Sequence, residues 1–222
     1  AMKHRKTIKQ AAQTIPVCKG RTYELQIDRL GTSGEGVGRY ENFTVFVPNA
    51  LPGETVSVII EEVKNSYARG RIKQILHESV DRVAPLCELY EECGGCQLQH
   101  LSYEAQLRAK RAQVVDALTH IGKLPQIPVR ETLRAEDPWN YRNKMQFPIG
   151  RNSGQIVIGC FAQGSHTIIN TENCHIQRAE NNDLANAARE IAEQLHIPVY
   201  NEDTHKGVLR HIVGRVGRSN DL

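Results

Sequence analysis

Apolar and polar residues alternate in the first third of the chain in the pattern of short β-strands. The stretch Tyr23–Ile27 alternates in this way, and strand-like runs follow at Phe43–Val47, Thr55–Glu62 and Ala68–Leu76. A period of two residues places every second side chain on the same face, as expected for strands that cover a core.

Turn-forming residues separate these runs. The segment Gly31–Gly38 predicts a glycine-rich turn, and further turns are indicated near residues 49–53 and 65–66. The spacing Gly34-x-Gly36-x-Gly38 is similar to a phosphate-binding loop, but a strand pattern follows it where a helix is required. We therefore interpret these glycines as turns that allow positive φ. Short strands joined by such turns predict a small closed β-barrel of the oligonucleotide-binding type over residues 17–77.

Two helices are predicted in the remainder of the chain. Ser102 is placed to cap a helix that runs to about Ile121 and ends at Gly122. The apolar residues of this helix share a stripe at helical spacing: Leu107, Val114, Leu118 and Ile121. A second helix is indicated by the apolar pattern from Leu184 to Leu195, and Pro198 stops it.

A strand pattern returns after Tyr141. The turn at Asn152–Gly154 predicts a hairpin with Ile156–Ile158 as its second strand. The inward positions of the first strand are Met145, Phe147 and Ile149. Pro148 lacks a backbone N–H group, so we expect it on an unpaired edge.

A last strand is expected at Gly207–Val216, followed by a turn at residues 219–220. A strand that turns back without a partner suggests that the chain is a fragment. The predicted fold class is α+β and mainly β. A flexible basic tail at residues 1–16 and the barrel at 17–77 precede an α+β central domain at 78–222, which we expect to be incomplete at its C-terminus.

Composition and charge exclude few classes of function. The 222 residues are 40% hydrophobic and 24% charged, and the formal net charge is +3, as in ordinary globular proteins. That charge is too small to indicate a nucleic acid partner, although local basic clusters could bind a polyanion. No apolar run has the length of a membrane span, and no secretion signal is evident. We therefore expect a cytoplasmic protein with no membrane partner.

Six cysteines in a reducing compartment favour metal or redox chemistry over disulfides. The spacing Cys87-x5-Cys93-x2-Cys96 places three thiols on one loop, and the two glycines before Cys96 allow tight folding. A fourth ligand must come from elsewhere. Cys174 lies in a loop just before a helix and is the best candidate, with Cys160 next, while Cys18 precedes the barrel.

The thiol pattern leaves several chemistries open. Four sulfurs suit zinc or an iron–sulfur cluster. Structural zinc sites usually pair two short Cys-x2–4-Cys motifs, so the three-plus-one arrangement favours a [4Fe–4S] cluster, with zinc second. A redox pair at Cys93 and Cys96 is less favoured because no thioredoxin-like βαβ pattern surrounds it. Unrelated buried cysteines are the remaining interpretation. No set of nucleophile, base and orienting group indicates a catalytic site.

The residues around the cysteine loop show a family resemblance. The run from Leu86 to Lys110, with Cys93-Gly-Gly-Cys96-Gln-Leu-Gln-His100, resembles the cluster loop of the RNA uracil-5-methyltransferases that form 5-methyluridine in ribosomal RNA. Other stretches are similar to successive parts of this family and cover about residues 17–222: the TRAM-barrel start at Gly31–Gly38, the central-domain strand Trp139–Phe147, Asn173-Cys174, and the later strand Gly207–His211.

The resemblance implies a TRAM domain, then a central domain whose [4Fe–4S] cluster is held by Cys87, Cys93, Cys96 and Cys174. It implies structured RNA as the partner, most of all ribosomal RNA. The family's S-adenosylmethionine site and catalytic cysteine belong to a third domain with no matching positions here. We therefore expect no catalytic or cofactor-binding residue in this chain, which is predicted to be inactive alone.

The same resemblance, with the exposed basic pattern, implies RNA contacts by Tyr141, Arg142, Asn143, Lys144, Gln146, Arg210 and His211. An ion pair at the surface is the other interpretation of Arg142. The competing function is a free-standing RNA-binding module with a structural zinc. The whole methyltransferase is expected to be monomeric, whereas the fragment could exchange its helix at 102–121 between copies or self-associate.

Overall fold

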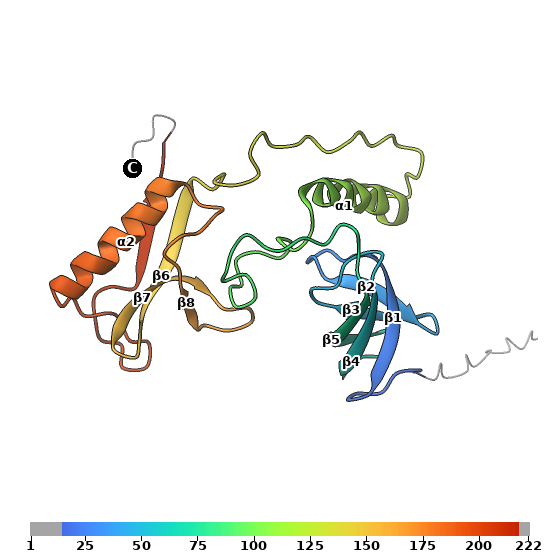
Figure 1. Ribbon diagram of the computed structural model, residues 1–222, viewed down its shortest axis with the longest axis horizontal. Coiled ribbons are helices and arrows are strands. Elements are labelled where there is room, and N and C mark those ends of the chain that lie inside the picture. Colours follow the sequence, from blue (N-terminus) through green and yellow to red (C-terminus); the bar gives the residue numbers. More distant parts are fainter. Residues whose placement is uncertain (1–14, 218–222) are drawn as a thin grey trace, which may run out of the picture. The chain divides into compact units, whose positions relative to one another are not determined.

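The computed structural model describes residues 15–217. The predicted tail at 1–16 therefore lies almost entirely outside the described residues, and the turn at 219–220 does so completely. The chain divides into two compact units, one reaching Val80 and the other starting at Asp81 (Figure 1). Within residues 15–217, no helix combines the length and apolar character that a membrane crossing requires.

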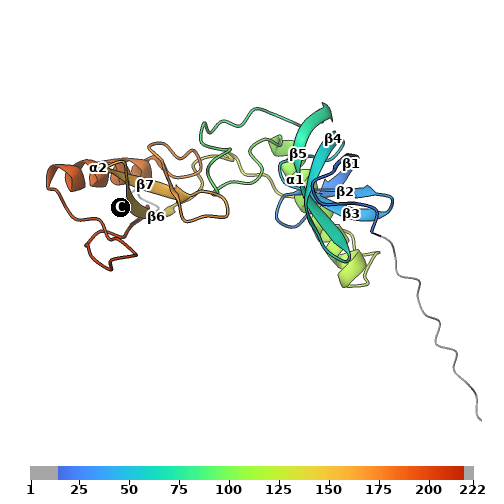
Figure 2. The same cartoon turned by 90° about the horizontal axis from the view of Figure 1, so that it is seen from below.

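The first unit is a closed barrel of five strands in the order β1-β2-β3-β5-β4 (Figure 2). All neighbouring strands are antiparallel except β3 and β5, which pair in parallel. The mainly β fold with a small closed barrel is confirmed. The strands are β1 Thr22–Leu30, β2 Gly36–Tyr40, β3 Phe43–Val47, β4 Thr55–Val63 and β5 Tyr67–His77.

Alternation along the strands produces the core of the barrel. Inward residues such as Val45 and Val58 are completely buried, while their neighbours in sequence are partly or fully exposed. The interpretation of Gly36 and Gly38 as turn residues was wrong, because both lie within β2. A Cβ atom on Gly38 would lie 2.5 Å from the carbonyl oxygen of Gln26, so this glycine permits close approach of β1.

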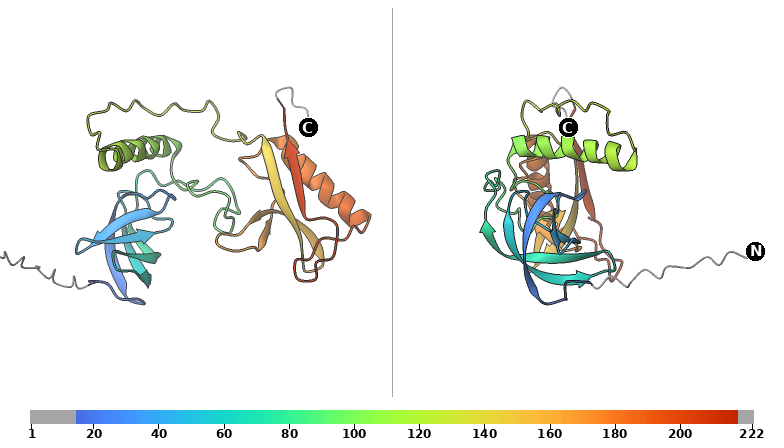
Figure 3. Two further views of the ribbon diagram at one scale, coloured as in Figure 1. Left: turned by 180° about the vertical axis from the view of Figure 1, so that it is seen from behind. Right: turned by 90° about the vertical axis from the view of Figure 1, so that its right-hand side faces the viewer.

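The second unit contains a four-stranded antiparallel sheet in the order β8-β7-β6-β9. Helix α2, Ala179–Gln194, packs along one face of it (Figure 3). Between them the predicted inward residues of β6, including Met145 and Phe147, are buried. The strands are β6 Lys144–Asn152, β7 Gln155–Phe161, β8 Ile168–Asn170 and β9 His211–Arg215. The last strand is therefore shorter than the predicted Gly207–Val216.

The expectation that Pro148 occupies an unpaired edge was wrong. It is buried in β6, which pairs with β7 on one side and β9 on the other, and it lies opposite His211. Its missing N–H group costs no ladder bond because the β6–β7 pairing stops at Ile149, and β7 then pairs with β8 instead. The proline thus marks the place where β7 changes partner.

Helix α1, Tyr103–Asp116, continues as one π-helical segment, η1, over Ala117–Ile121. The side chain of Ser102 accepts a hydrogen bond from the N–H of Ala105, which confirms the predicted N-cap. The predicted apolar stripe is not buried: Val114 and Ile121 are exposed, and Ala105 is the buried residue of α1. Spacing alone therefore overestimated how much of this helix contacts a core.

Candidate metal centre

Successive turns fold the loop that carries Cys87, Cys93 and Cys96. The N–H of Tyr90 donates to the carbonyl of Cys87 at 3.1 Å, and the N–H of Cys93 donates to the carbonyl of Leu89 at 2.8 Å. The N–H of Cys87 is held in turn by the side-chain oxygen of Gln99 at 3.2 Å. Gln99 was not identified from the sequence, because a single amide side chain carries no spacing signal.

The loop is attached to the end of strand β7. The N–H of Gly94 donates to the carbonyl of Phe161 at 2.9 Å, and Cys93 forms an isolated antiparallel bridge with Ala162. A Cβ atom on Gly94 would lie 2.9 Å from the same carbonyl oxygen, so only glycine allows this approach. The attachment brings Cys93 next to Cys160, which lies on β7.

Cys174 is positioned by the first turns of helix α2. Its N–H donates to the side-chain oxygen of Asn182 at 3.1 Å, and the amide nitrogen of Asn182 donates back to the Cys174 carbonyl at 3.3 Å. The N–H of Gln177 donates to the same carbonyl at 3.0 Å. Because Asn182 is itself buried, this reciprocal pair fixes the backbone from which the Cys174 side chain projects.

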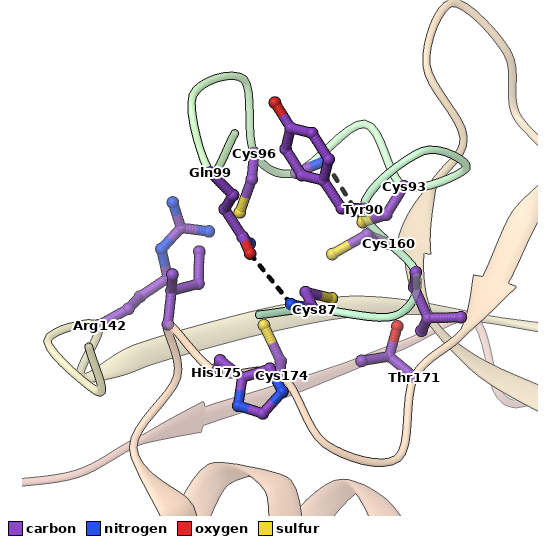
Figure 4. A pocket seen from close by; sticks show the side chains of 13 residues that line it. Cys87, Tyr90, Cys93, Cys96, Gln99, Arg142, Cys160, Thr171, Cys174 and His175 are labelled. Carbon is purple, nitrogen blue, oxygen red and sulfur yellow. Dashed lines mark hydrogen bonds between the residues drawn. The ribbon is translucent and has the colours of Figure 1, made fainter. Parts of the chain in front are cut away.

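Five cysteine side chains line one shared cavity. Figure 4 shows the sulfur atoms of Cys87, Cys93, Cys96, Cys160 and Cys174 around a shared space. Arg142, His175 and Thr171 also line it. The structure thus brings together the four cysteines singled out in the sequence and adds Cys160. All six cysteines of the chain are free thiols, and Cys18 is exposed in the barrel unit.

Burial and hydrogen bonding make the thiols unequal. The hydrogen bond with Cys160 lowers the pKa of Cys93 to about 6, and the same bond raises the pKa of Cys160. The thiol of Cys160 is therefore the donor in this hydrogen bond, and the sulfur of Cys93 is the acceptor. Burial raises the pKa of both Cys87 and Cys174.

The donor set can be compared with candidate metals. Within residues 15–217, no group of three His, Cys, Asp or Glu side chains is arranged to hold one metal ion. A structural zinc needs four ligands, with each thiolate sulfur about 2.3 Å from a single centre. Here the thiols surround a cavity instead. The all-thiol lining suits an iron–sulfur cluster as well as zinc in its chemistry, and the cluster itself stays a prediction.

The residues predicted to contact RNA do not share one environment. Tyr141, Lys144, Gln146 and His211 are exposed. The side chain of Arg142 lines the cysteine cavity. The carbonyl of Asn143 accepts from the N–H of Val216. Arg210 forms an ion pair of 3.1 Å with Glu202 and lies over the ring of Tyr200.

Comparison with known proteins gives this geometry a context. Residues 16–73 match the family model of the TRAM domain. The chain is 42% identical over 207 residues to an uncharacterized RNA methyltransferase of Halalkalibacterium halodurans, covering 93% of this chain and 45% of that protein. It is 45% identical over 201 residues to an uncharacterized RNA methyltransferase of Clostridium tetani, covering 90% of this chain and 44% of that protein.

The chain is homologous to the RNA methyltransferases. Among solved structures, the tRNA (uracil-54, C5)-methyltransferase of Pyrococcus abyssi, crystallised with S-adenosyl-L-homocysteine, matches with a TM-score of 0.61 at 25% identity. The match covers 88% of this chain and 43% of that one. The chain therefore spans less than half the length of these methyltransferase relatives.

Proposed function

We propose that this chain is the RNA-binding and cluster-binding portion of an S-adenosylmethionine-dependent RNA uracil-5-methyltransferase that forms 5-methyluridine in ribosomal RNA. The observation that carries the proposal is the cavity lined by five cysteines in a chain that also has a TRAM domain and RNA methyltransferase relatives. Such an enzyme is expected in the cytoplasm, where its thiols stay reduced.

The proposed [4Fe–4S] cluster would be bound by Cys87, Cys93, Cys96 and Cys174. When bound, it would supply metal–thiolate bonds that cross-link the loop at 87–96 to the segment before α2, and binding energy becomes folding energy. Methyl transfer from S-adenosylmethionine to a base moves no net electrons between protein groups, so the role proposed for these cysteines is structural. They would hold the RNA-binding surface of this unit in shape.

Structured RNA would be held through its phosphates, with splayed bases stacking on aromatic or arginine side chains. Ribosomal RNA is proposed from the motifs of the cysteine loop, whereas the similar protein of known structure is a tRNA methyltransferase. The motifs of the catalytic domain have no matching positions in residues 1–222. This polypeptide is therefore proposed to bind RNA without methylating it.

The test of the proposal begins with protein purified without oxygen. We expect a brown sample with about four irons and four sulfides per chain, and Cys96→Ser should lose them while Cys18→Ser keeps them. A colourless sample with one tightly held zinc would contradict the cluster and favour a structural zinc module.

The substrate is tested by titrating ribosomal RNA fragments and tRNA against the chain at one salt concentration. Tighter binding of ribosomal RNA is expected, and a clear preference for tRNA would contradict the proposed substrate. Methylation is measured with the product of the whole reading frame, with residues 1–222 alone as the control. The whole product should transfer a methyl group to carbon 5 of uracil and the control should not.

A further inference from the structure

Two cations face each other across the edge of the central sheet. Lys144 on β6 lies directly opposite Arg215 on β9. Backbone hydrogen bonds join Val216 to Asn143 and Ile149 to Arg210, each at 2.9 Å. Because hydrogen-bonded and non-hydrogen-bonded pairs alternate in an antiparallel ladder, Lys144 and Arg215 form a non-hydrogen-bonded pair. Side chains approach each other most closely at such pairs.

The face that carries these two side chains is the one away from helix α2. Their neighbours Met145 and Gly214 are buried, and a Cβ atom on Gly214 would lie 2.8 Å from the side chain of Leu184 in α2. Since side chains alternate between faces, Lys144 and Arg215 project to the other side, where both are exposed.

Neither Lys144 nor Arg215 has an acidic partner at salt-bridge distance within the part of the chain that the structure describes. By contrast, Arg210 pairs with Glu202 and Arg178 with Glu180. The other residues on this face of the two paired strands are neutral or weakly basic: Gln146, Pro148, His211 and Val213. Like charges directly opposite each other destabilise a sheet, so the fold retains an unfavourable contact that an anion would relieve.

We propose that Lys144 and Arg215 together bind one backbone phosphate of the RNA. This inference rests on the proposed function and adds Arg215, which the sequence motifs did not single out. The guanidinium can donate two parallel hydrogen bonds to the phosphate oxygens, and the ammonium adds a point charge. Arg142 belongs to the same sequence motif as Lys144, Trp139–Phe147, but its side chain lines the cysteine cavity. It therefore lies outside this phosphate site.

The test combines RNA affinity with stability in the full chain. Arg215→Gln should reduce the slope of log K against log salt by about 1, the loss of one phosphate contact. The same substitution should raise the midpoint of thermal unfolding, because it removes the repulsion with Lys144. Arg215→Glu should raise the midpoint further and weaken RNA binding further, while Arg215→Lys should keep the slope. Arg134→Gln is the control, because Arg134 already pairs with Glu104 and its loss should leave the slope unchanged.

The outcomes separate this inference from the proposed function. If wild-type protein binds RNA and Arg215→Gln binds with the same salt slope, the phosphate site is overturned and the function stands. If wild-type protein binds no RNA, both are overturned. Inorganic phosphate is the second probe: stabilisation of wild type but not of Arg215→Gln by phosphate, without any change in RNA slope, would overturn the assignment to RNA.

Discussion

The barrel unit and the central unit of this chain are each stabilised by different interactions. The barrel has a continuous apolar core in which strands from Leu25 to Ala68 contribute fully buried side chains. The central unit has a smaller core between α2 and its sheet. Its connecting segments leave large apolar side chains such as Leu86 and Leu133 exposed. Its loops are instead positioned by hydrogen bonds and by cysteines around a cavity.

This difference indicates which interactions stabilise each unit. Apolar burial is non-directional and scales with area, so the barrel is expected to fold without any ligand. Side chains such as Asn182 and Gln99 fix the geometry of the cysteine segments but bury little apolar surface. The central unit is therefore expected to depend on the group that its cysteines bind.

The largest effect is expected from Cys174→Ser. The substitution should release the metal and unfold the central unit, because binding energies in structural metal sites are on the order of 10 kcal/mol. The barrel should keep its own unfolding transition. Iron content and hydrogen exchange resolved by unit measure both effects, with Cys18→Ser as the matched control. Full metal content in Cys174→Ser, together with its loss in Cys160→Ser, would instead identify Cys160 as the fourth ligand.

A substitution in the barrel core should have the converse effect. Leu25 is 2% exposed, and Leu25→Ala should cost about 2–5 kcal/mol through lost burial and a residual cavity. Only the barrel transition in urea should shift, with iron content unchanged. Leu76→Ala is the control, since Leu76 is 46% exposed on β5. A loss of iron in Leu25→Ala would show that the two units fold as one.

The barrel is also stabilised by a buried carboxylate, so its stability does not come from apolar burial alone. Glu54 is completely buried, and its carboxylate accepts from the N–H groups of Leu51 at 2.8 Å and Ser79 at 3.4 Å. Glu54→Ala leaves these donors without that acceptor and should cost about 1–3 kcal/mol. Equilibrium unfolding measures this loss of stability, with Glu61→Ala as the control. Glu61 forms an exposed ion pair with Arg71, and the loss of that pair should cost about 0–1 kcal/mol. Equal effects of the two substitutions would contradict a structural role for Glu54.

The smallest effect is expected at the start of α1. Ser102 caps this helix and also donates to Asp81 at 3.4 Å. Ser102→Ala should destabilise the helix by about 1 kcal/mol, while Ser102→Thr should restore most of that loss. Hydrogen exchange of the first turn, Tyr103–Gln106, detects the difference. Unchanged protection in the alanine variant would mean that the rest of the unit determines this helix end.

Local patterns were sufficient for much of the fold. Four of the five barrel strands and the β6–β7 hairpin were predicted because a two-residue period and a Ser153-Gly154 turn act over a few residues. The N-cap at Ser102 was predicted for the same reason. Strand β2 was taken for a turn, because its glycines are selected by close contact with other strands, and a local pattern cannot show such a contact.

Local patterns were also insufficient to predict every cysteine of the candidate metal centre. Spacing identified Cys87, Cys93 and Cys96 and nominated Cys174, because three thiols on one glycine-containing loop are a chemical signal. Cys160 ranked only second as the fourth ligand, because it lies within a strand pattern. It reaches the cavity only because Gly94 attaches the loop to the end of β7.

The sequence by itself determined four of the five barrel strands, the presence of a thiol-rich site and the resemblance to RNA methyltransferases, because periodicity, turn chemistry and cysteine spacing are all local properties. Only the tertiary structure decided which groups surround each basic residue. It turned Arg142 towards the cysteines and placed Lys144 opposite Arg215. Residues 144 and 215 are far apart in the chain, and only the register of β6 against β9 brings their charges together.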